Sequence, residues 1–145
     1  MARNPITFRA TTEIRAPRHD VWKVMEDVVR WPDWTPTVKS VVPLDNSALM
    51  VGRRYRVKQP GVATAVWKTT RVEPNSGFAW EARSPGLLLV GAHDLEGNGP
   101  TRVSLAFTLE GPISGFAAWF ARAKIQKFLE MEAEALKRRV EGKRR

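Results

Sequence analysis

The first residues of the chain alternate between two sets of side chains. One face holds Ile6, Phe8, Ala10, Thr12 and Ile14. This period of two predicts a β-strand over residues 6–14. Pro17 follows and is expected to open a helix, because proline suits the first helical position. An apolar stripe at helical spacing comes next, formed by Val21, Val24, Met25 and Val28. Pro32 then ends this helix or restarts a short second helix around Trp34.

Between residues 38 and 109 the pattern changes to short segments bounded by Gly, Pro, Asn and Asp. Such punctuation is typical of an antiparallel meander, because these residue types supply the backbone angles of turns. The candidate strands are Val38–Leu44, Arg53–Gln59, Ala65–Val72, Phe78–Arg83, Leu87–Leu95 and Val103–Leu109. With the first strand, the sequence predicts about seven strands.

A long helix is expected from Gly111-Pro112 to about Glu141. Thirty residues would span ~45 Å, more than the ~38 Å diameter of a compact domain of this length. The helix should therefore cross the whole sheet, with room for its basic end to protrude. The stripe expected to be buried consists of Ile113, Phe116, Ala117, Phe120, Phe128 and Met131. Ile125, Leu129 and Leu136 lie to one side of this stripe, and Trp119 is expected to point away from it. An antiparallel sheet curled around a long helix is an α+β fold.

Composition narrows the class of protein. With 145 residues, 43% hydrophobic and 27% charged, we expect a single folded domain over residues 1–145. The absence of cysteine excludes disulfides, thiolate nucleophiles and cysteine metal sites. The first residues lack the apolar stretch of a signal peptide. The longest uncharged run, residues 111–121, is about half of a ~20-residue membrane span. These features predict a soluble, cytoplasmic protein.

The net charge of +9 raises anionic partners as a possibility. More than half of it lies in the basic tail, Lys137–Arg145, and further cations lie on the outward face of one strand at Arg54, Arg56 and Lys58. An anionic membrane surface or RNA could bind these groups. A short basic helix end is also a common solubilising terminus that complements the helix dipole. Docking through these cations is therefore one alternative function.

Four segments together resemble a known family. They are APRHDVWKVMEDVVRWPDWTP (16–36), VGRRYRVKQPG (51–61), WKTTRVEPNSGFAWEARSPG (67–86) and AHDLEGNGPTRVSLAFTLEGPISGFAAWFAR (92–122). As a set they resemble the START-like (SRPBCC) polyketide cyclase/dehydrase and lipid-transport proteins. The resemblance implies a helix-grip fold, with a curved seven-stranded sheet wrapped around the C-terminal helix and two short helices after the first strand. The group includes carriers, cyclases, chaperone regulators and receptors, so the resemblance does not choose a function.

Strand parity identifies the residues expected to face the interior. The candidate ligand-binding set is Tyr55, Gln59, Trp67, Thr69, Trp80, His93 and Phe107 from the strands, Phe116 and Phe120 from the long helix, and Trp34 at the mouth. Aromatic walls with few polar groups are typical of a small-molecule site. Such residues also fill ordinary cores. The family resemblance, which implies a hollow between sheet and helix, favours the ligand cavity.

Two functions remain for such a cavity. One is binding or transport of a hydrophobic or aromatic small molecule such as a lipid or polyketide. The alternative is a cyclase or dehydratase in which His93 and Tyr55 act as acid and base. His93 is the one histidine expected to face inward, but strand parity places Asp94, Glu96 and Glu81 on the other face. We therefore expect no orienting carboxylate beside it, no metal site and no cofactor.

Overall fold

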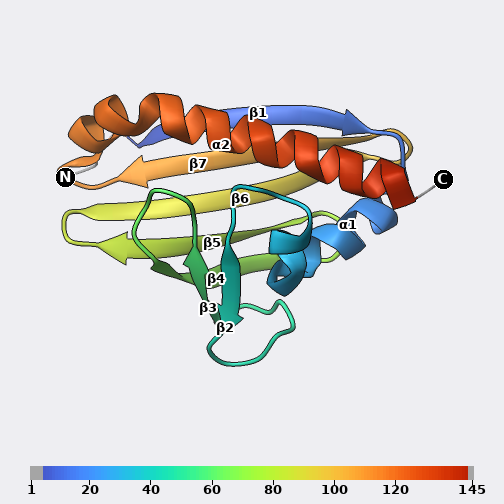
Figure 1. Cartoon of the computed structure of the whole chain (residues 1–145), viewed down its shortest axis with the longest axis horizontal. Helices are drawn as coiled ribbons and strands as arrows, with labels where there is room; N and C mark the ends of the chain where they lie inside the picture. The colour runs from blue at the N-terminus through green and yellow to red at the C-terminus, as the bar shows by residue number, and fades with distance from the viewer. Residues whose placement is uncertain (1–4, 144–145) are drawn as a thin grey trace.

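The computed structural model describes residues 5–143. The strands are β1 (Ile6–Ile14), β2 (Ser40–Pro43), β3 (Arg54–Lys58), β4 (Ala65–Glu73), β5 (Gly77–Ser84), β6 (Leu87–Gly97) and β7 (Thr101–Glu110). The helices are α1 (Arg18–Glu26), the 3-10 helix η1 (Val28–Asp33) and α2 (Ser114–Lys143). All strand pairs are antiparallel, in the order β1-β7-β6-β5-β4-β3-β2. The predicted α+β helix-grip architecture is confirmed, with α2 running across one face of the sheet (Figure 1).

The first connection differs in detail from the expectation. The second short helix was expected around Trp34, but η1 ends at Asp33, and the Trp34 N–H donates to the carbonyl of Trp31 just beyond it. The strand expected from Val38 starts at Ser40, because the Val38 N–H is used in a turn to the Thr35 carbonyl. A turn hydrogen bond therefore occupies Val38, and the first hydrogen bond to β3 comes from the Lys39 N–H, which donates to the Lys58 carbonyl at 2.8 Å.

The first turns of α2 bury the face opposite to the predicted one, whereas Phe128 of the predicted stripe does line the interior. Ile113, Phe116 and Phe120 are 45%, 69% and 68% exposed. The residues turned toward the sheet and α1 include Ala118, Ile125, Leu129, Ala133, Leu136 and Val140, most of them fully buried. At about 100° per residue, Phe116 lies 180° from Ile125. The longer run of apolar positions in the second half fixes the helix face, and the first two turns follow it. Trp119, expected to point away, is 63% exposed.

The C-terminal end of the helix does not protrude as expected. The α2 helix continues to Lys143, and its last turns contact the end of β1 and the residue after it, with Val140 2% exposed. The Lys137 ammonium donates to the Glu13 carbonyl, and the Glu141 carboxylate accepts the Arg15 N–H at 2.9 Å. Arg144 and Arg145 lie outside the described residues. Lys137, Val140 and Glu141 therefore hold this helix end against the rest of the molecule, while Arg138 remains exposed.

The core lies between the sheet and the helical segments. An aromatic cluster forms its centre, where Trp31 of η1 contacts Phe78 and Trp80 of β5 at ring-centroid distances of 6.0 and 5.4 Å. Trp22 of α1 also contacts Phe78, edge-on at a centroid distance of 6.5 Å. These rings fix η1 against the sheet and leave space further along, toward α2. No helix among residues 5–143 is long and apolar enough to cross a membrane.

Candidate ligand-binding site

A cavity of about 160 Å³ lies between the sheet and α2. Its walls are mainly apolar. The rings come from Trp31, Trp67, Trp80, Phe107 and Phe128, the aliphatic side chains include Val38, Val57, Leu105, Ile125 and Leu129, and the polar side chains are Gln59, His93, Lys124 and Glu132. An apolar cavity of ~150 Å³ is large enough to bind benzene. The cavity therefore has room for one aromatic ring.

One glycine helps to shape the cavity wall. Gly91 of β6 pairs with Trp80 of β5 and lines the cavity with it. A Cβ atom at this position would lie 3.0 Å from Trp80 Nε1 and 3.1 Å from Trp80 Cδ1. The missing side chain therefore lets the Trp80 indole lie against the strand.

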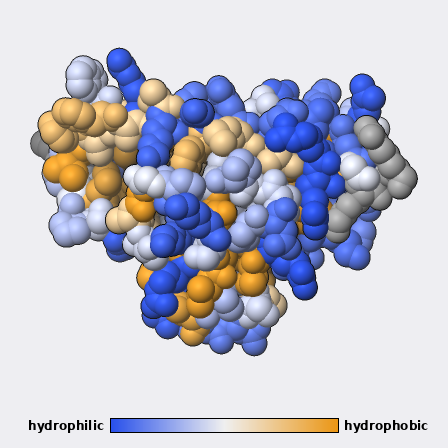
Figure 2. Space-filling model, viewed as in Figure 1, coloured by the Kyte–Doolittle hydropathy of each residue, from blue (hydrophilic) through white to orange (hydrophobic). Residues whose placement is uncertain are grey.

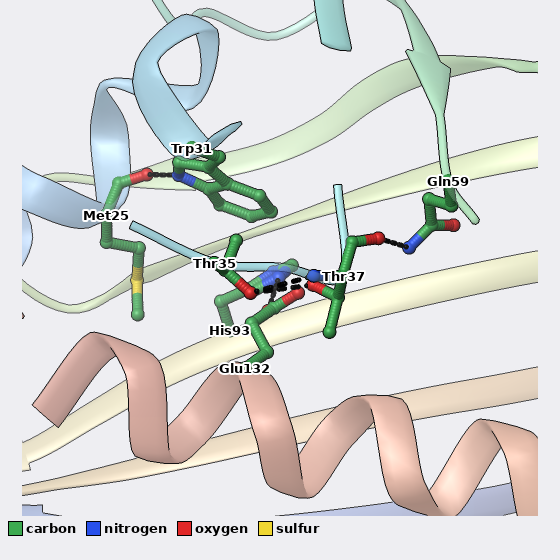
Figure 3. Close-up of polar contacts among 7 residues, drawn as sticks. All are labelled: Met25, Trp31, Thr35, Thr37, Gln59, His93 and Glu132. Carbon is green, nitrogen blue, oxygen red and sulfur yellow. Dashed lines mark hydrogen bonds and ion pairs between the residues drawn. The ribbon is translucent and has the colours of Figure 1, made fainter. Parts of the chain in front are cut away.

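His93 provides the central polar group of the cavity wall. Its imidazole Nε2 lies 3.4 Å from Oε2 of Glu132, which projects from α2 toward β6 (Figure 3). The two side chains are only 8% and 14% exposed. Phe78 stacks on the imidazole at 4.4 Å with an interplanar angle of 5°, and Trp31 contacts it at 5.2 Å. The imidazole is therefore held between rings and faces a carboxylate across the cavity wall.

The second ring nitrogen of His93 has no partner. Its Nδ1 atom is buried and makes no hydrogen bond within residues 5–143. A buried polar atom without a partner costs about 1–3 kcal/mol.

Buried hydrogen bonds hold the segment after η1 over the sheet. The hydroxyls of Thr35 and Thr37 lie 2.8 Å apart, and Gln59 Nε2 donates to the Thr37 carbonyl at 3.2 Å. Trp31 Nε1 donates to the Met25 carbonyl at 3.0 Å, which fixes the indole (Figure 3). These contacts connect the η1–β2 segment to β3 and keep that wall of the cavity in place.

The outer end of the cavity lies between α2 and the loop from β3 to β4. Lys124 of α2 donates to the carbonyl of Gly61 in that loop at 3.0 Å, and its ammonium lies 5.7 Å from the Phe128 ring. Lys124 and Val62 both line the cavity and are exposed. One hydrogen bond therefore joins the two sides of the opening.

The structure places five of the predicted site residues in the lining. They are Gln59, Trp67, Trp80, His93 and Phe107. Thr69 faces inward and is fully buried, but it is outside the lining. Four of these side chains belong to strands and follow from parity, because β-strands send alternate side chains to one face, and Gln59 lies just after β3.

Tyr55 does not reach the cavity. It is fully buried, its ring lies 6.1 Å from that of Trp80, and its hydroxyl donates to the carbonyls of Ser47 at 3.2 Å and Ala48 at 3.0 Å. Burial raises the pKa of the Tyr55 hydroxyl above its ordinary value. The hydroxyl therefore holds the β2–β3 loop, and its predicted role as an acid–base group in the cavity is wrong.

Three further placements need correction. Trp34 is outside the lining, and its neighbour Trp31, at a centroid distance of 5.9 Å, occupies the cavity wall instead. Phe116 and Phe120 point to solvent on the far side of α2. The 3-10 geometry of η1 turns Trp31 rather than Trp34 inward. The rotation of α2 about its axis places Phe116 and Phe120 in solvent.

The expectation that His93 has no carboxylate partner is also wrong. Strand parity considered only neighbours on the sheet, whereas Glu132 comes from α2. A signal for it was present in the sequence, since Glu132 follows Ile125 by seven residues and so shares its helix face. Within residues 5–143, no group of three or more His, Asp or Glu side chains could hold a metal ion.

Comparison with known proteins agrees with this geometry. The sequence model of the polyketide cyclase/dehydrase and lipid transport family matches residues 5–141, so the chain belongs to that family. No curated protein matches the sequence significantly.

Solved structures of low sequence identity share the fold. A norcoclaurine synthase point mutant from Thalictrum flavum, in complex with a transition-state analogue, has 13% identity and a TM-score of 0.75, covering 100% of this chain and 99% of its own. The aromatase/cyclase ZhuI from Streptomyces sp. R1128 has 18% identity and a TM-score of 0.69, covering 97% and 93%. TTHA0849 from Thermus thermophilus has 18% identity and a TM-score of 0.75, covering 95% and 99%. At these identities the likeness establishes the fold alone.

Proposed function

We propose that the protein binds a small aromatic or otherwise hydrophobic molecule, such as a polyketide or lipid fragment, in the cavity between the sheet and α2. The observation that carries this proposal is an apolar cavity with the His93–Glu132 pair in its wall. Family membership and the ligand-binding and cyclase proteins that share the fold support the same class of ligand.

The ligand fits best when it combines a flat apolar part with one polar group. Burial of ~200 Å² of apolar surface stabilises a complex by about 5 kcal/mol before the cost of association. A hydroxyl on the ligand can donate to the Glu132 carboxylate, which lines the cavity beside His93. We therefore expect 2-naphthol to bind more tightly than 2-methoxynaphthalene, which lacks the donor.

Indole NMR signals provide a site-resolved test. The chain has six tryptophans, of which Trp31, Trp67 and Trp80 line the cavity. Addition of 2-naphthol to the ¹⁵N-labelled protein should shift the indole signals of these three residues. The indole of Trp119, which is exposed on the far side of α2, should stay in place. Shifts of Trp119 without shifts of Trp67 and Trp80 would show binding to the exterior and refute the proposal.

A matched pair of variants on α2 strengthens the test. Ala121 lines the cavity, whereas Ala123 is exposed two residues later. Ala121→Phe fills the space and should weaken 2-naphthol binding at least tenfold. Ala123→Phe adds the same ring outside and should leave the affinity unchanged. Equal effects of both variants would contradict a cavity site.

The contact between His93 and Glu132 favours one second candidate, an acid–base enzyme of the cyclase or dehydratase type. Imidazole readily transfers protons near neutral pH, and a carboxylate on its second nitrogen orients it for this task. In this mechanism the His93–Glu132 pair removes a proton from a carbon next to a carbonyl and later returns a proton to the product. Glu132 holds the ring and stabilises the imidazolium that forms. Tyr55 has no part in it.

Hydrogen–deuterium exchange tests the enzyme candidate without knowledge of the substrate. Benzoylacetone carries an acidic methylene group, and NMR follows its exchange in D₂O. Wild-type protein should accelerate exchange above the buffer rate, and His93→Gln should abolish the acceleration while 2-naphthol still binds. Binding of benzoylacetone without any acceleration would favour the carrier over the enzyme.

A further inference from the structure

The first two turns of α2, together with Ile113 just before them, carry an exposed apolar patch. It consists of Ile113, Phe116, Trp119 and Phe120, each between 45% and 69% exposed. The rings of Phe116 and Phe120 lie 4.7 Å apart, and those of Trp119 and Phe120 lie 5.2 Å apart, so the side chains form one surface. Figure 2 shows hydrophobic residues gathered over the end of the molecule where α2 begins.

The size of the patch exceeds the ordinary scatter of exposed apolar side chains. Each of the three aromatic side chains has a surface of ~150–250 Å² and is about two thirds exposed. Together they present roughly 300–500 Å² of apolar surface to solvent. Contiguous patches of this size on a monomer are often functional. A stable protein interface needs ~800 Å² from each partner. The patch alone is too small for a stable pairing of two copies.

The charged residues that follow the patch along the first half of α2 have one sign. Between Glu110 and Glu130 the chain carries Arg122, Lys124 and Lys127 and no carboxylate. The Arg122 guanidinium lies 5.6 Å from the centre of the Trp119 ring. Lys124 and Lys127 are exposed on the following turns. An aromatic tip followed by cations is complementary to a bilayer, whose apolar interior lies beneath anionic headgroups.

We propose that the apolar patch and the cations beside it dock the protein on an anionic lipid bilayer. The rings of Phe116, Trp119 and Phe120 enter the interface between headgroups and acyl chains, and Arg122 and Lys127 contact lipid phosphates. The net charge of +9 favours this occupant over a second copy of the chain, because two copies would repel each other. The inference goes beyond ligand binding and does not require the cavity to be occupied.

The position of the patch connects it to the cavity. Ala121 and Lys124 line the cavity and lie one and four residues after Phe120 on the same helix. Docking through the patch therefore brings the outer end of the cavity near the bilayer surface. A hydrophobic ligand could pass between bilayer and cavity over a short distance.

Vesicle sedimentation tests the proposal with the full chain. The probes are phosphatidylcholine vesicles and vesicles in which phosphatidylglycerol replaces one quarter of the phosphatidylcholine. We expect binding to the anionic vesicles, much weaker binding to the neutral ones, and at least a tenfold loss of affinity in Phe116→Ser/Phe120→Ser. The matched control, Met50→Ser/Val51→Ser, removes two apolar residues that are 53% and 64% exposed elsewhere and should bind like wild type.

Charge variants locate the cationic part of the surface. Arg122→Gln/Lys127→Gln should weaken binding to anionic vesicles, whereas Arg56→Gln/Lys58→Gln removes the same charge from β3 and should not. Equal losses in both pairs would show attraction by net charge alone and overturn the proposal. The proposal also fails if wild type is a dimer by light scattering and Phe116→Ser/Phe120→Ser makes it a monomer.

Discussion

The imidazole Nε2 of His93 lies 3.4 Å from the carboxylate Oε2 of Glu132, joining the middle of β6 to α2 across the wall of the cavity. The separation exceeds that of an ideal hydrogen bond, but both groups are largely buried, so little water screens their interaction. This pair is the polar feature on which both candidate functions depend.

The contact predicts the tautomer of His93. With Glu132 as the acceptor, the neutral imidazole should carry its proton on Nε2 and leave Nδ1 as an acceptor. The ¹⁵N shifts of the ring should therefore show a protonated Nε2 and an unprotonated Nδ1. Glu132→Gln should mix the two tautomers, because an amide accepts less strongly than a carboxylate. A ring that is protonated mainly on Nδ1 in the wild type would contradict this assignment.

The stability of the protein at alkaline pH should depend on Tyr55, the only tyrosine in the chain. Burial raises its pKa in the folded state above the ordinary value of 10.0. Below pH 10 both states keep the proton, so Tyr55 adds no pH dependence. Above it the unfolded chain loses its proton first, and stability falls as the pH rises toward the folded pKa.

Absorbance and circular dichroism check this prediction directly. Tyrosinate absorbance should appear only above pH 10. It should appear at the same pH at which the helical circular dichroism is lost, because the single tyrosine ionises on unfolding. Tyrosinate in a protein that keeps its full helical signal at pH 10 would show an exposed hydroxyl. Tyr55→Phe should cost about 1 kcal/mol at neutral pH, since it removes the hydrogen bonding to the β2–β3 loop.

Stability at acid pH should depend on Glu141. The Arg15 N–H and the Lys137 ammonium, each 2.9 Å from its carboxylate, hold its pKa below the ordinary 4.5. Below pH 4.5 the unfolded chain binds a proton first, so this contribution is present above 4.5 and is lost as the pH falls through the folded value. Because the site is partly exposed, the effect should not exceed ~1 kcal/mol.

Urea unfolding at neutral and acid pH measures this effect. Glu141→Gln should lower the free energy of unfolding at pH 7 and flatten its decline toward acid pH. The control Glu134→Gln lies on the same helix, 3.7 Å from Arg138 in an exposed ion pair, and should change little. An equal effect of the two substitutions would refute a specific role for Glu141.

Two phenylalanines should differ sharply in their effect on stability. Phe78 is fully buried between Trp22, Trp31 and the His93 ring, so Phe78→Ala should cost about 3–5 kcal/mol. Phe116 is 69% exposed, so Phe116→Ala should stay within about 0.5 kcal/mol. Thermal or urea unfolding of both variants compares them. A large loss in Phe116→Ala would mean that α2 is rotated from the position described above.

The sequence by itself determined the order of elements and most of the sheet lining. Alternation along a strand has a period of two, so Trp67, Trp80, His93 and Phe107 could be placed inside before any partner was known. Turn residues marked the strand ends to within about two residues. The family resemblance added the expectation of a cavity between sheet and helix, which local patterns do not contain.

Only the tertiary structure decided what depends on packing between elements. An α-helix with apolar residues on several sides can bury any one of these faces. In α2 the face with Ile125 and Leu136 is turned inward, and the face with Phe116 and Phe120 is exposed. The same rotation brought Glu132 to His93 and left the aromatic patch outside. Local periodicity cannot choose between these rotations, because the free energy that separates them comes from contacts with distant strands.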